Sequence, residues 1–151
     1  MASPPRKGKY KPKNPQKYKG DPRNIIYRSG WERDVMSYCD NTSKVVWWKS
    51  EEVSIPYYNP IRKRWCRYFP DIIMGVERDY GIEVRVVEIK PHKLTQPPKT
   101  PKRKTKSYYY HMEQYIINQC KWKECEKWCE DRGYNFQILT EEQNTKWKKR
   151  K

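Results

Sequence analysis

The sequence predicts one α/β domain whose elements follow the order helix, three strands, helix, strand. Three observations carry this prediction: a capped segment of helical periodicity near residue 30, β-rich runs between residues 45 and 89, and a long proline-free helical pattern that ends before residue 134. A chain of 151 residues suits a single domain. At that length a hydrophobic core can form without disulfides or a structural metal.

The first helix is predicted over residues 29–40. The segment Ser29-Gly-Trp-Glu32 matches the S-x-x-E capping box, in which the serine caps the helix and the glutamate reaches back to it. The residues that recur at helical spacing, and that we therefore expect to face the core, are Trp31, Val35, Tyr38 and Cys39.

Strands follow in the middle of the chain. Residues 45–48 and 53–58 are β-rich, and residues 59–64 have the composition of a turn leading into 65–69, which predicts a β-hairpin. Its second arm continues through 71–74, and after another turn comes the apolar strand 82–89. We expect three sequential strands to form an antiparallel meander.

The second half of the chain is predicted to be a loop, a helix and a final strand. Residues 91–107 hold six Lys or Arg, several prolines and no acid, which predicts a basic loop. Residues 108–132 lack proline, and Gly133 ends the predicted helix before the alternating strand 134–139. One side of this helix should carry Tyr115, Asn118, Trp122, Cys125 and Cys129.

The ends of the chain differ in composition from the domain between them. Residues 1–24 are rich in Lys, Pro, Gly and Tyr and nearly lack aliphatic residues, which predicts a disordered, flexible basic N-terminal arm. We therefore expect an arm over 1–24, a domain over 25–142 that includes the basic proline-rich loop 91–107, and a basic tail over 143–151.

Charge and cysteine usage narrow the class of protein. A net charge of +16 predicts a polyanionic partner, and nucleic acid is the obvious one. Five cysteines with no C-x-x-C pair, and no signal-peptide pattern, predict a reducing intracellular compartment. No apolar stretch has membrane-spanning length, and no amphipathic helix outside the core favours binding to anionic lipid.

The candidate site lies in two segments, Arg67-Tyr-Phe-Pro-Asp71 and Val86-Val-Glu-Ile-Lys90. Side chains alternate along a strand, so Glu88 and Lys90 share one face while Ile89 points into a core. If the strand holding Asp71 pairs alongside, two carboxylates meet, and a divalent cation between them would relieve their repulsion. This is the PD…ExK pattern of Mg²⁺-dependent nucleases.

Each site residue has an expected role in phosphodiester hydrolysis. Asp71 and Glu88 would bind Mg²⁺, with Mn²⁺ as a substitute, and the main-chain carbonyl of Ile89 is a third candidate ligand. Lys90 would contact the attacking water or a non-bridging phosphate oxygen and stabilise transition-state charge. The predicted activity is that of a metal-dependent endodeoxyribonuclease.

Several alternatives stay open from the residues alone. Glu88 and Lys90 can form an exposed salt bridge, and Glu32 has a sufficient role in capping its helix or can serve as a further metal carboxylate. Cys125 and Cys129 share a helix face, but two thiolates without a second pair are more often buried as small hydrophobes than bound to zinc. Lys121 and Asn118 can approach a phosphate and are left outside the catalytic set.

The expected substrate contact is with the DNA backbone. Basic segments with interleaved Tyr and Trp flank the site in sequence, which favours phosphate contacts with some stacking. No motif for reading base edges is present, so we expect binding largely independent of sequence. A small RNA-binding protein is a weaker alternative that rests on composition.

Ordered motifs along most of the chain match a known family. They are Gly20-Asp21, Tyr27-Arg-Ser-Gly-Trp-Glu32, Ser54-Ile-Pro-Tyr57, Tyr68-Phe-Pro-Asp71, Val87-Glu-Ile-Lys-Pro91, Asn118 with Lys121-Trp122, and Ile138-Leu-Thr-Glu141. On these motifs the chain resembles the head-completion nucleases of large tailed bacteriophages, relatives of the TnsA endonucleases that cleave transposon ends.

The resemblance implies a restriction-endonuclease-like αβββαβ core, with a central mixed sheet flanked by helices and a PD-(D/E)xK site. It places Glu32, Asp71, Glu88 and Lys90 on the family's active-site positions, with Glu32 among the metal ligands. It also implies an assembly factor in the host cytoplasm or the virion head and neck, which acts on packaged DNA near the portal or other head proteins. The alternative is a structural DNA-end-binding or capsid-joining protein that keeps a nuclease fold without requiring catalysis.

Overall fold

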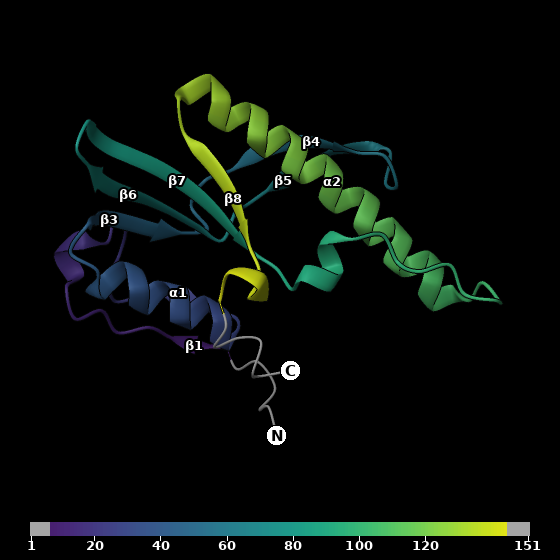
Figure 1. The fold of residues 1–151 in the computed structure, drawn as a ribbon, viewed down its shortest axis with the longest axis horizontal. Coiled ribbons are helices and arrows are strands. Elements are labelled where there is room, and N and C mark those ends of the chain that lie inside the picture. The colour runs from purple at the N-terminus through teal and green to yellow at the C-terminus, as the bar shows by residue number, and fades with distance from the viewer. Residues whose placement is uncertain (1–6, 145–151) are drawn as a thin grey trace.

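A four-stranded mixed sheet forms the centre of the molecule (Figure 1). The structure is a computed structural model, which describes residues 7–144. The strands lie in the order β3 (Val45–Ser50), β6 (Ile72–Arg78), β7 (Gly81–Ile89) and β8 (Asn135–Leu139), and β8 pairs parallel to β7 whereas the other neighbours are antiparallel. This confirms the predicted α/β class with its mixed sheet.

Helices cover both faces of this sheet. The first, α1 (Gly30–Asn41), lies on one face and the second, α2 (Lys106–Arg132), on the other (Figure 1). Alternation along the strands supplies both cores: Ile72 and Val87 pack on the side of α1, whereas Ile73 and Val86 pack on the side of α2. Because both faces of the sheet are covered, successive residues of these strands are apolar, and the strands form apolar runs in the sequence.

The buried side of α1 differs in part from the predicted one. Ser29 caps the helix, its Oγ accepting the N–H of Glu32 at 3.1 Å. Val35 and Cys39 are buried as expected, but Tyr38 is exposed and Met36 is buried instead. The prediction for Tyr38 is wrong because the buried stripe is centred nearer Glu32 and Met36, which rotates Tyr38 toward solvent.

The predicted hairpin forms, but not as part of a meander. Strands β4 (Ile55–Asn59) and β5 (Arg64–Tyr68) make a separate two-stranded sheet. The chain leaves β5 at residues 69–71, where Pro70 has no N–H to donate to a ladder and the carbonyl of Asp71 accepts the N–H of Glu51. β6 then enters between β3 and β7, so the expectation of a sequential three-stranded meander is wrong.

The predicted second helix and its flanks are confirmed with small shifts. Thr105 caps α2, and Gly133 ends it in the left-handed conformation at φ 70°. Its buried stripe consists of Ile117, Trp122, Cys125 and Cys129. In the basic loop a short 3-10 turn, η2 (His92–Thr95), is followed by irregular chain to the cap.

The N-terminal segment is ordered where the structure describes it. Strand β1 (Gly8–Lys9) pairs with β2 (Ile26–Tyr27), a 3-10 turn η1 (Pro15–Lys17) follows β1, and Tyr18 packs against the Trp48 ring at 4.7 Å between centroids. The flexible arm is therefore a wrong prediction for residues 7–24. Aromatic burial and hydrogen bonds offset the entropy of ordering that aliphatic burial alone could not. The start of the arm and residues 145–151 of the tail lie outside the described residues.

The cysteines and the helices bear on two expectations, about disulfides and about membrane-spanning segments. All five cysteines are free thiols, in agreement with the absence of a disulfide framework. In the part of the chain that the structure describes, no helix has the length and apolar character needed to cross a bilayer.

Candidate functional site

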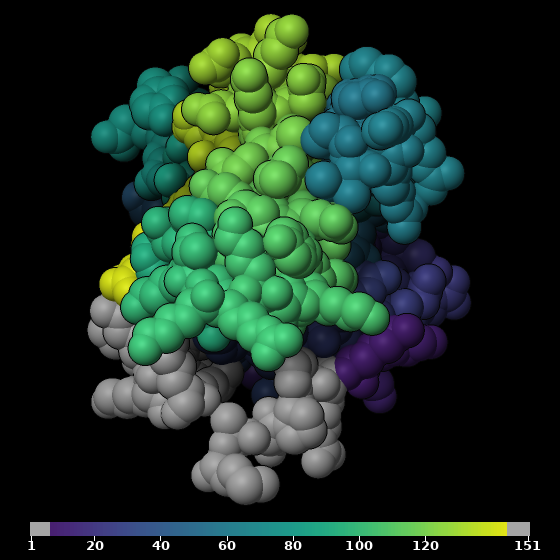
Figure 2. Space-filling view, turned by 90° about the vertical axis from the view of Figure 1, so that its right-hand side faces the viewer, coloured from purple at the N-terminus to yellow at the C-terminus, as the bar shows by residue number. Residues whose placement is uncertain are grey.

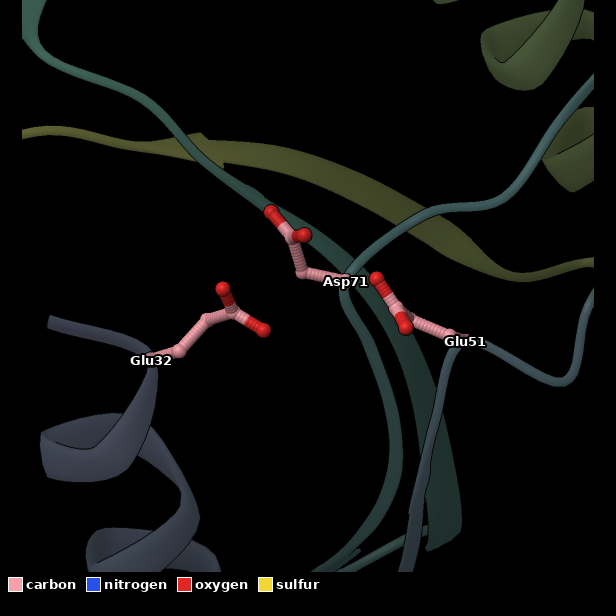
Figure 3. Close-up of side chains that lie close together, drawn as sticks. All are labelled: Glu32, Glu51 and Asp71. Atoms are coloured by element: carbon pink, nitrogen blue, oxygen red, sulfur yellow. The ribbon is translucent and has the colours of Figure 1, made fainter. Parts of the chain in front are cut away.

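Three carboxylates from separate elements meet at one end of the sheet. One oxygen from each of Glu32, Glu51 and Asp71 lies within 4.8 Å of the others, and Figure 3 shows Glu32 pointing toward the other two. Glu32 comes from the first turn of α1, Glu51 directly follows β3, and Asp71 directly precedes β6. Within residues 7–144 this trio is the one group of acidic, His or Cys side chains with the spacing of a metal site.

Asp71 is held on the same side as the ExK segment. Its Oδ2 accepts the backbone N–H of Ile89 at 2.7 Å. Burial, followed by the nearby charge of Glu88, raises the pKa of Asp71 to about 8, with a further contribution from Glu32. Asp71 therefore faces Glu88, as the sequence predicts, and the two carboxylates disfavour one another's charge.

Glu88 and Lys90 form an ion pair that is not an exposed surface pair. Glu88 is only 6% exposed, and the Lys90 Nζ lies 3.7 Å from its Oε2. The Tyr68 hydroxyl donates to Glu88 Oε1 at 2.9 Å, while Ile89 packs against the core on the side of α1. The interpretation of Glu88 and Lys90 as a solvated pair is therefore wrong, although the ion pair itself exists.

Glu32 keeps an unused carboxylate oxygen. The residue is 7% exposed, and its Oε1 is buried without a hydrogen-bond partner. Burial, followed by the charge of Glu51, raises its pKa. Of the predicted capping box, the Ser29 half forms, with the Glu32 N–H 3.1 Å from the Ser29 Oγ. Because Glu32 Oε1 has no hydrogen-bond partner, this oxygen is available to a ligand.

Glu51 was not predicted as a site residue. Its backbone adopts φ 51°, in the left-handed region that a non-glycine residue enters at a cost of about 1–3 kcal/mol. The N–H of Glu51 donates to the Asp71 carbonyl at 3.2 Å, and the Arg28 guanidinium donates to its carboxylate. These two contacts fix the side chain beside Asp71.

Tyr68 was not predicted as a neighbour of the site, whereas Lys121 was expected to be able to approach a phosphate and was left outside the catalytic set. The Lys121 Nζ lies 5.8 Å from the ring centroid of Tyr68 and 5.9 Å from that of Tyr57. Burial lowers the pKa of Lys121, and the charge of Glu88 opposes that shift. The sequence signal for Tyr68 was its position two residues before the Pro70-Asp71 pair, at the end of β5.

The trio has the donor chemistry of a hard divalent cation. Carboxylate oxygens are the ligands that Mg²⁺ and Mn²⁺ prefer. The Glu32 side chain points toward the other two groups (Figure 3), and its Oε1 is buried without a hydrogen-bond partner. The raised pKa of Asp71 shows how unfavourable its charge is with protein groups alone. A cation among these oxygens would remove that penalty.

The cysteines give no comparable site. Cys125 and Cys129 lie buried on one face of α2, and their mutual contact raises the pKa of the first thiol and lowers that of the second. His111 is exposed, with Nδ1 against the Ser107 carbonyl at 2.7 Å. The pair packs as small apolar groups within the core beneath α2.

Comparison with known proteins identifies the family of this chain. Residues 42–141 match the family described as TnsA-like endonuclease N terminal. The chain belongs to the TnsA-like endonuclease family. It is also 39% identical over 139 residues to the head completion nuclease of Enterobacteria phage T4, an alignment that covers 89% of this chain and 91% of that protein.

The family assignment confirms the resemblance read from the ordered motifs. The matched TnsA-like range includes Glu51, Asp71, Glu88 and Lys90, whereas Glu32 precedes it. No solved structure matches the chain. The position of Glu32 in the site therefore rests on the geometry described above.

Proposed function

We propose that this chain is a divalent-metal-dependent DNA endonuclease that acts in phage head completion. Membership of the TnsA-like endonuclease family supports DNA cleavage, and the similarity to the head completion nuclease of phage T4 supports a role in head completion. The observation that carries the metal dependence is the trio of Glu32, Glu51 and Asp71, whose oxygens lie within 4.8 Å of one another.

The proposed ligands are carboxylates around one end of the sheet. Asp71 and Glu32 are the central pair, Glu51 joins them, and Glu88 with the main-chain carbonyl of Ile89 completes the set. Mg²⁺ is the proposed ion, with Mn²⁺ as a substitute. When bound, such an ion neutralises phosphoryl charge and lowers the pKa of an attacking water.

Lys90 is the proposed transition-state cation. Its ammonium lies beside Glu88 at 3.7 Å, and Tyr68 fixes the other oxygen of that carboxylate. Lys90 is therefore held next to the proposed metal ligands, and we propose that it donates to the attacking water or to a non-bridging phosphate oxygen. Lys121, above the Tyr68 ring, adds positive charge on the side of α2.

The proposed substrate is DNA contacted largely through its backbone, and the proposed place of action is the packaged DNA end. A net charge of +16 favours phosphate contacts whose strength falls with salt. Portal or other head proteins are the proposed partners, and the host cytoplasm during assembly is the proposed location.

Plasmid nicking tests the activity. Purified protein with Mg²⁺ should convert supercoiled plasmid to nicked or linear forms, and a chelator should stop it. Asp71→Ala and Lys90→Ala should abolish cleavage while DNA binding in chelator persists. Glu77→Ala, which removes an exposed carboxylate from the other end of β6, is the matched control and should cleave as wild type. Absence of cleavage by wild type, or cleavage by both site variants, contradicts the proposal.

A further inference from the structure

The β4–β5 hairpin carries two large aromatic side chains on its outer face. Tyr58 and Trp65 lie directly opposite one another in the antiparallel register, with ring centroids 5.9 Å apart at 75°. Tyr58 is 45% exposed and Trp65 is 68% exposed. Folding therefore leaves most of the Trp65 ring in water, where it contributes little to the stability of the core.

The opposite face of the hairpin anchors this aromatic pair. Ile55, Tyr57 and Tyr68 are buried, and they belong to the core cluster formed with α2. Figure 1 draws the hairpin apart from the four-stranded sheet and alongside α2, and Figure 2 shows it (blue) as a projection beside that helix (green). The outer face is thus presented on a rigid support.

The tip of the hairpin is also preorganised. The Asn59 side chain is buried, and its Oδ1 accepts the N–H groups of Ile61 and Arg62 at 3.0 Å each. Lys63 takes φ 55°, the left-handed conformation that closes the turn. A preorganised element loses little conformational entropy when it binds a partner.

The positive charge of the β4–β5 hairpin favours a polyanionic partner. Between residues 55 and 68 there is no acidic residue, and the basic ones are Arg62, Lys63, Arg64 and Arg67. Basic side chains around exposed aromatic rings are the combination that binds single-stranded nucleic acid, through phosphate contacts and base stacking. Bases inside a duplex present only their edges in the grooves, so stacking needs unpaired or terminal bases.

The hairpin leads directly into the active site. Tyr68 lies three residues beyond Trp65 on β5 and hydrogen-bonds Glu88, and Asp71 follows after three more residues. At about 3.3 Å per residue, Trp65 lies roughly 10 Å along the strand from Tyr68. A base stacked on Trp65 would therefore lie close to a phosphate held at the carboxylates.

We propose that the outer face of the β4–β5 hairpin binds unpaired bases of DNA, with Trp65 and Tyr58 as the stacking surface. The substrate class is then DNA with a single-stranded extension or a frayed end, cut near the junction with the duplex. This assignment of substrate rests on the proposed nuclease function, whereas binding to the hairpin can be measured without cleavage.

Binding in chelator, where no cleavage occurs, provides the test. The first probe is a duplex with a short single-stranded extension that carries 2-aminopurine. The second is a closed duplex without unpaired bases, in which a non-nucleotide linker joins the two strands at each end. Trp65→Ala should weaken binding to the first probe by about tenfold and remove the stacking-dependent change in 2-aminopurine fluorescence, because a stacked base contributes about 1–3 kcal/mol. The closed duplex should change less than about twofold.

Two variants control for fold and for general loss of aromatic surface. Trp65→Phe keeps a stacking ring and should retain most of the affinity. Tyr80→Ala removes an exposed aromatic from the β6–β7 turn, at the other end of β6 from Asp71, and should bind as wild type. All variants should unfold at nearly the wild-type temperature.

Three results would overturn the assignment: unchanged binding of Trp65→Ala to the extended probe, an equal loss on the closed duplex, or tighter wild-type binding to RNA of the same sequence. Each is independent of plasmid nicking. A failure of the nuclease proposal appears as absence of metal-dependent cleavage, whatever the hairpin binds.

Discussion

Helix α1 carries a buried carboxylate near each end, and the two have opposite surroundings. Asp40, in the last turn, is completely buried and accepts hydrogen bonds from the Tyr10 hydroxyl and from the N–H groups of Lys13 and Asn14. Glu32, in the first turn, is nearly as buried, but its Oε1 has no partner and its neighbours are Glu51 and Asp71. The same helix therefore holds one satisfied and one unsatisfied acid.

The pKa values follow this difference. Burial alone would raise the pKa of Asp40, but hydrogen bonds from Lys13, Tyr10 and Asn14 bring it below its ordinary value. Burial and then the charge of Glu51 raise the pKa of Glu32. Asp40 thus ties residues 7–24 to the core, whereas at the other end of α1 a buried oxygen of Glu32 lacks the donor that a purely structural acid would have.

Asp71→Asn tests the carboxylates near the Glu32 end of α1 and should have the largest effect on cleavage. Removing one charged ligand should lower Mg²⁺-dependent cleavage by about 10³-fold, as for loss of a major electrostatic contribution to the transition state. The metal-free protein should remain at least as stable as wild type, because an amide needs neither the burial of a charge nor the uptake of a proton that the raised pKa of Asp71 implies. Nicking rates and thermal unfolding in chelator measure both. Loss of stability together with activity would show that Asp71 is structural.

Asp40→Asn is the reciprocal test at the other end of α1. Loss of charge-assisted hydrogen bonds from Tyr10 and the two backbone N–H groups should destabilise the protein by about 2 kcal/mol. Cleavage measured well below the unfolding temperature should stay within a few-fold of wild type. Chemical denaturation gives the stability change, and unchanged stability would contradict the role assigned to these contacts.

The sequence predicts one part of the site well, because that part depends on local alternation. Glu88 and Lys90 fall on one side of β7 and Ile89 on the other, and the Pro70-Asp71 pair opens the strand beside them. The capped start of α1 likewise depends on four consecutive residues. Such features can be predicted from the sequence because the period of a strand or a helix determines which side chains share a face.

Glu51 could not be predicted, because its position depends on long-range pairing. Nothing in its own segment separates it from the exposed Glu52. Its carboxylate reaches the site because its N–H bonds the Asp71 carbonyl and because Arg28 holds it. The order of residues 7–24 was missed for the same reason, since their anchor Asp40 is distant in sequence and the segment has few aliphatic residues.

Glu51→Gln tests whether Glu51 is a metal ligand beside Glu32 and Asp71. If Glu51 completes the cation site, the variant should bind Mn²⁺ about tenfold more weakly, with a parallel loss of cleavage at limiting metal. Glu52→Gln, next in the chain and exposed, is the matched control and should bind as wild type. Equal metal affinity in both variants would assign Glu51 to its ion pair with Arg28 alone.

The pH dependence of stability should differ in sign between the two ends. The pKa of Asp71 is raised from 3.8 to about 8, so without metal the folded state keeps a proton that the unfolded chain loses, and stability should fall as pH rises between these values. The lowered pKa of Asp40 gives stability that is present above 3.8 and is lost as pH falls below it.

Thermal unfolding in chelator from pH 5 to 8 measures the first effect. The unfolding temperature of wild type should fall by several degrees toward pH 8, and Asp71→Asn should flatten that dependence while Asp40→Asn retains it. Excess Mn²⁺ should restore stability at pH 8. A flat wild-type profile would contradict the account of Asp71.

Anomalous diffraction from a crystal soaked in Mn²⁺ tests the central claim most directly. The account predicts a peak about 2.0–2.2 Å from carboxylate oxygens of Glu32 and Asp71, with Glu51 close by. A crystal with Mn²⁺ bound elsewhere, or with no peak between these two residues, would contradict it.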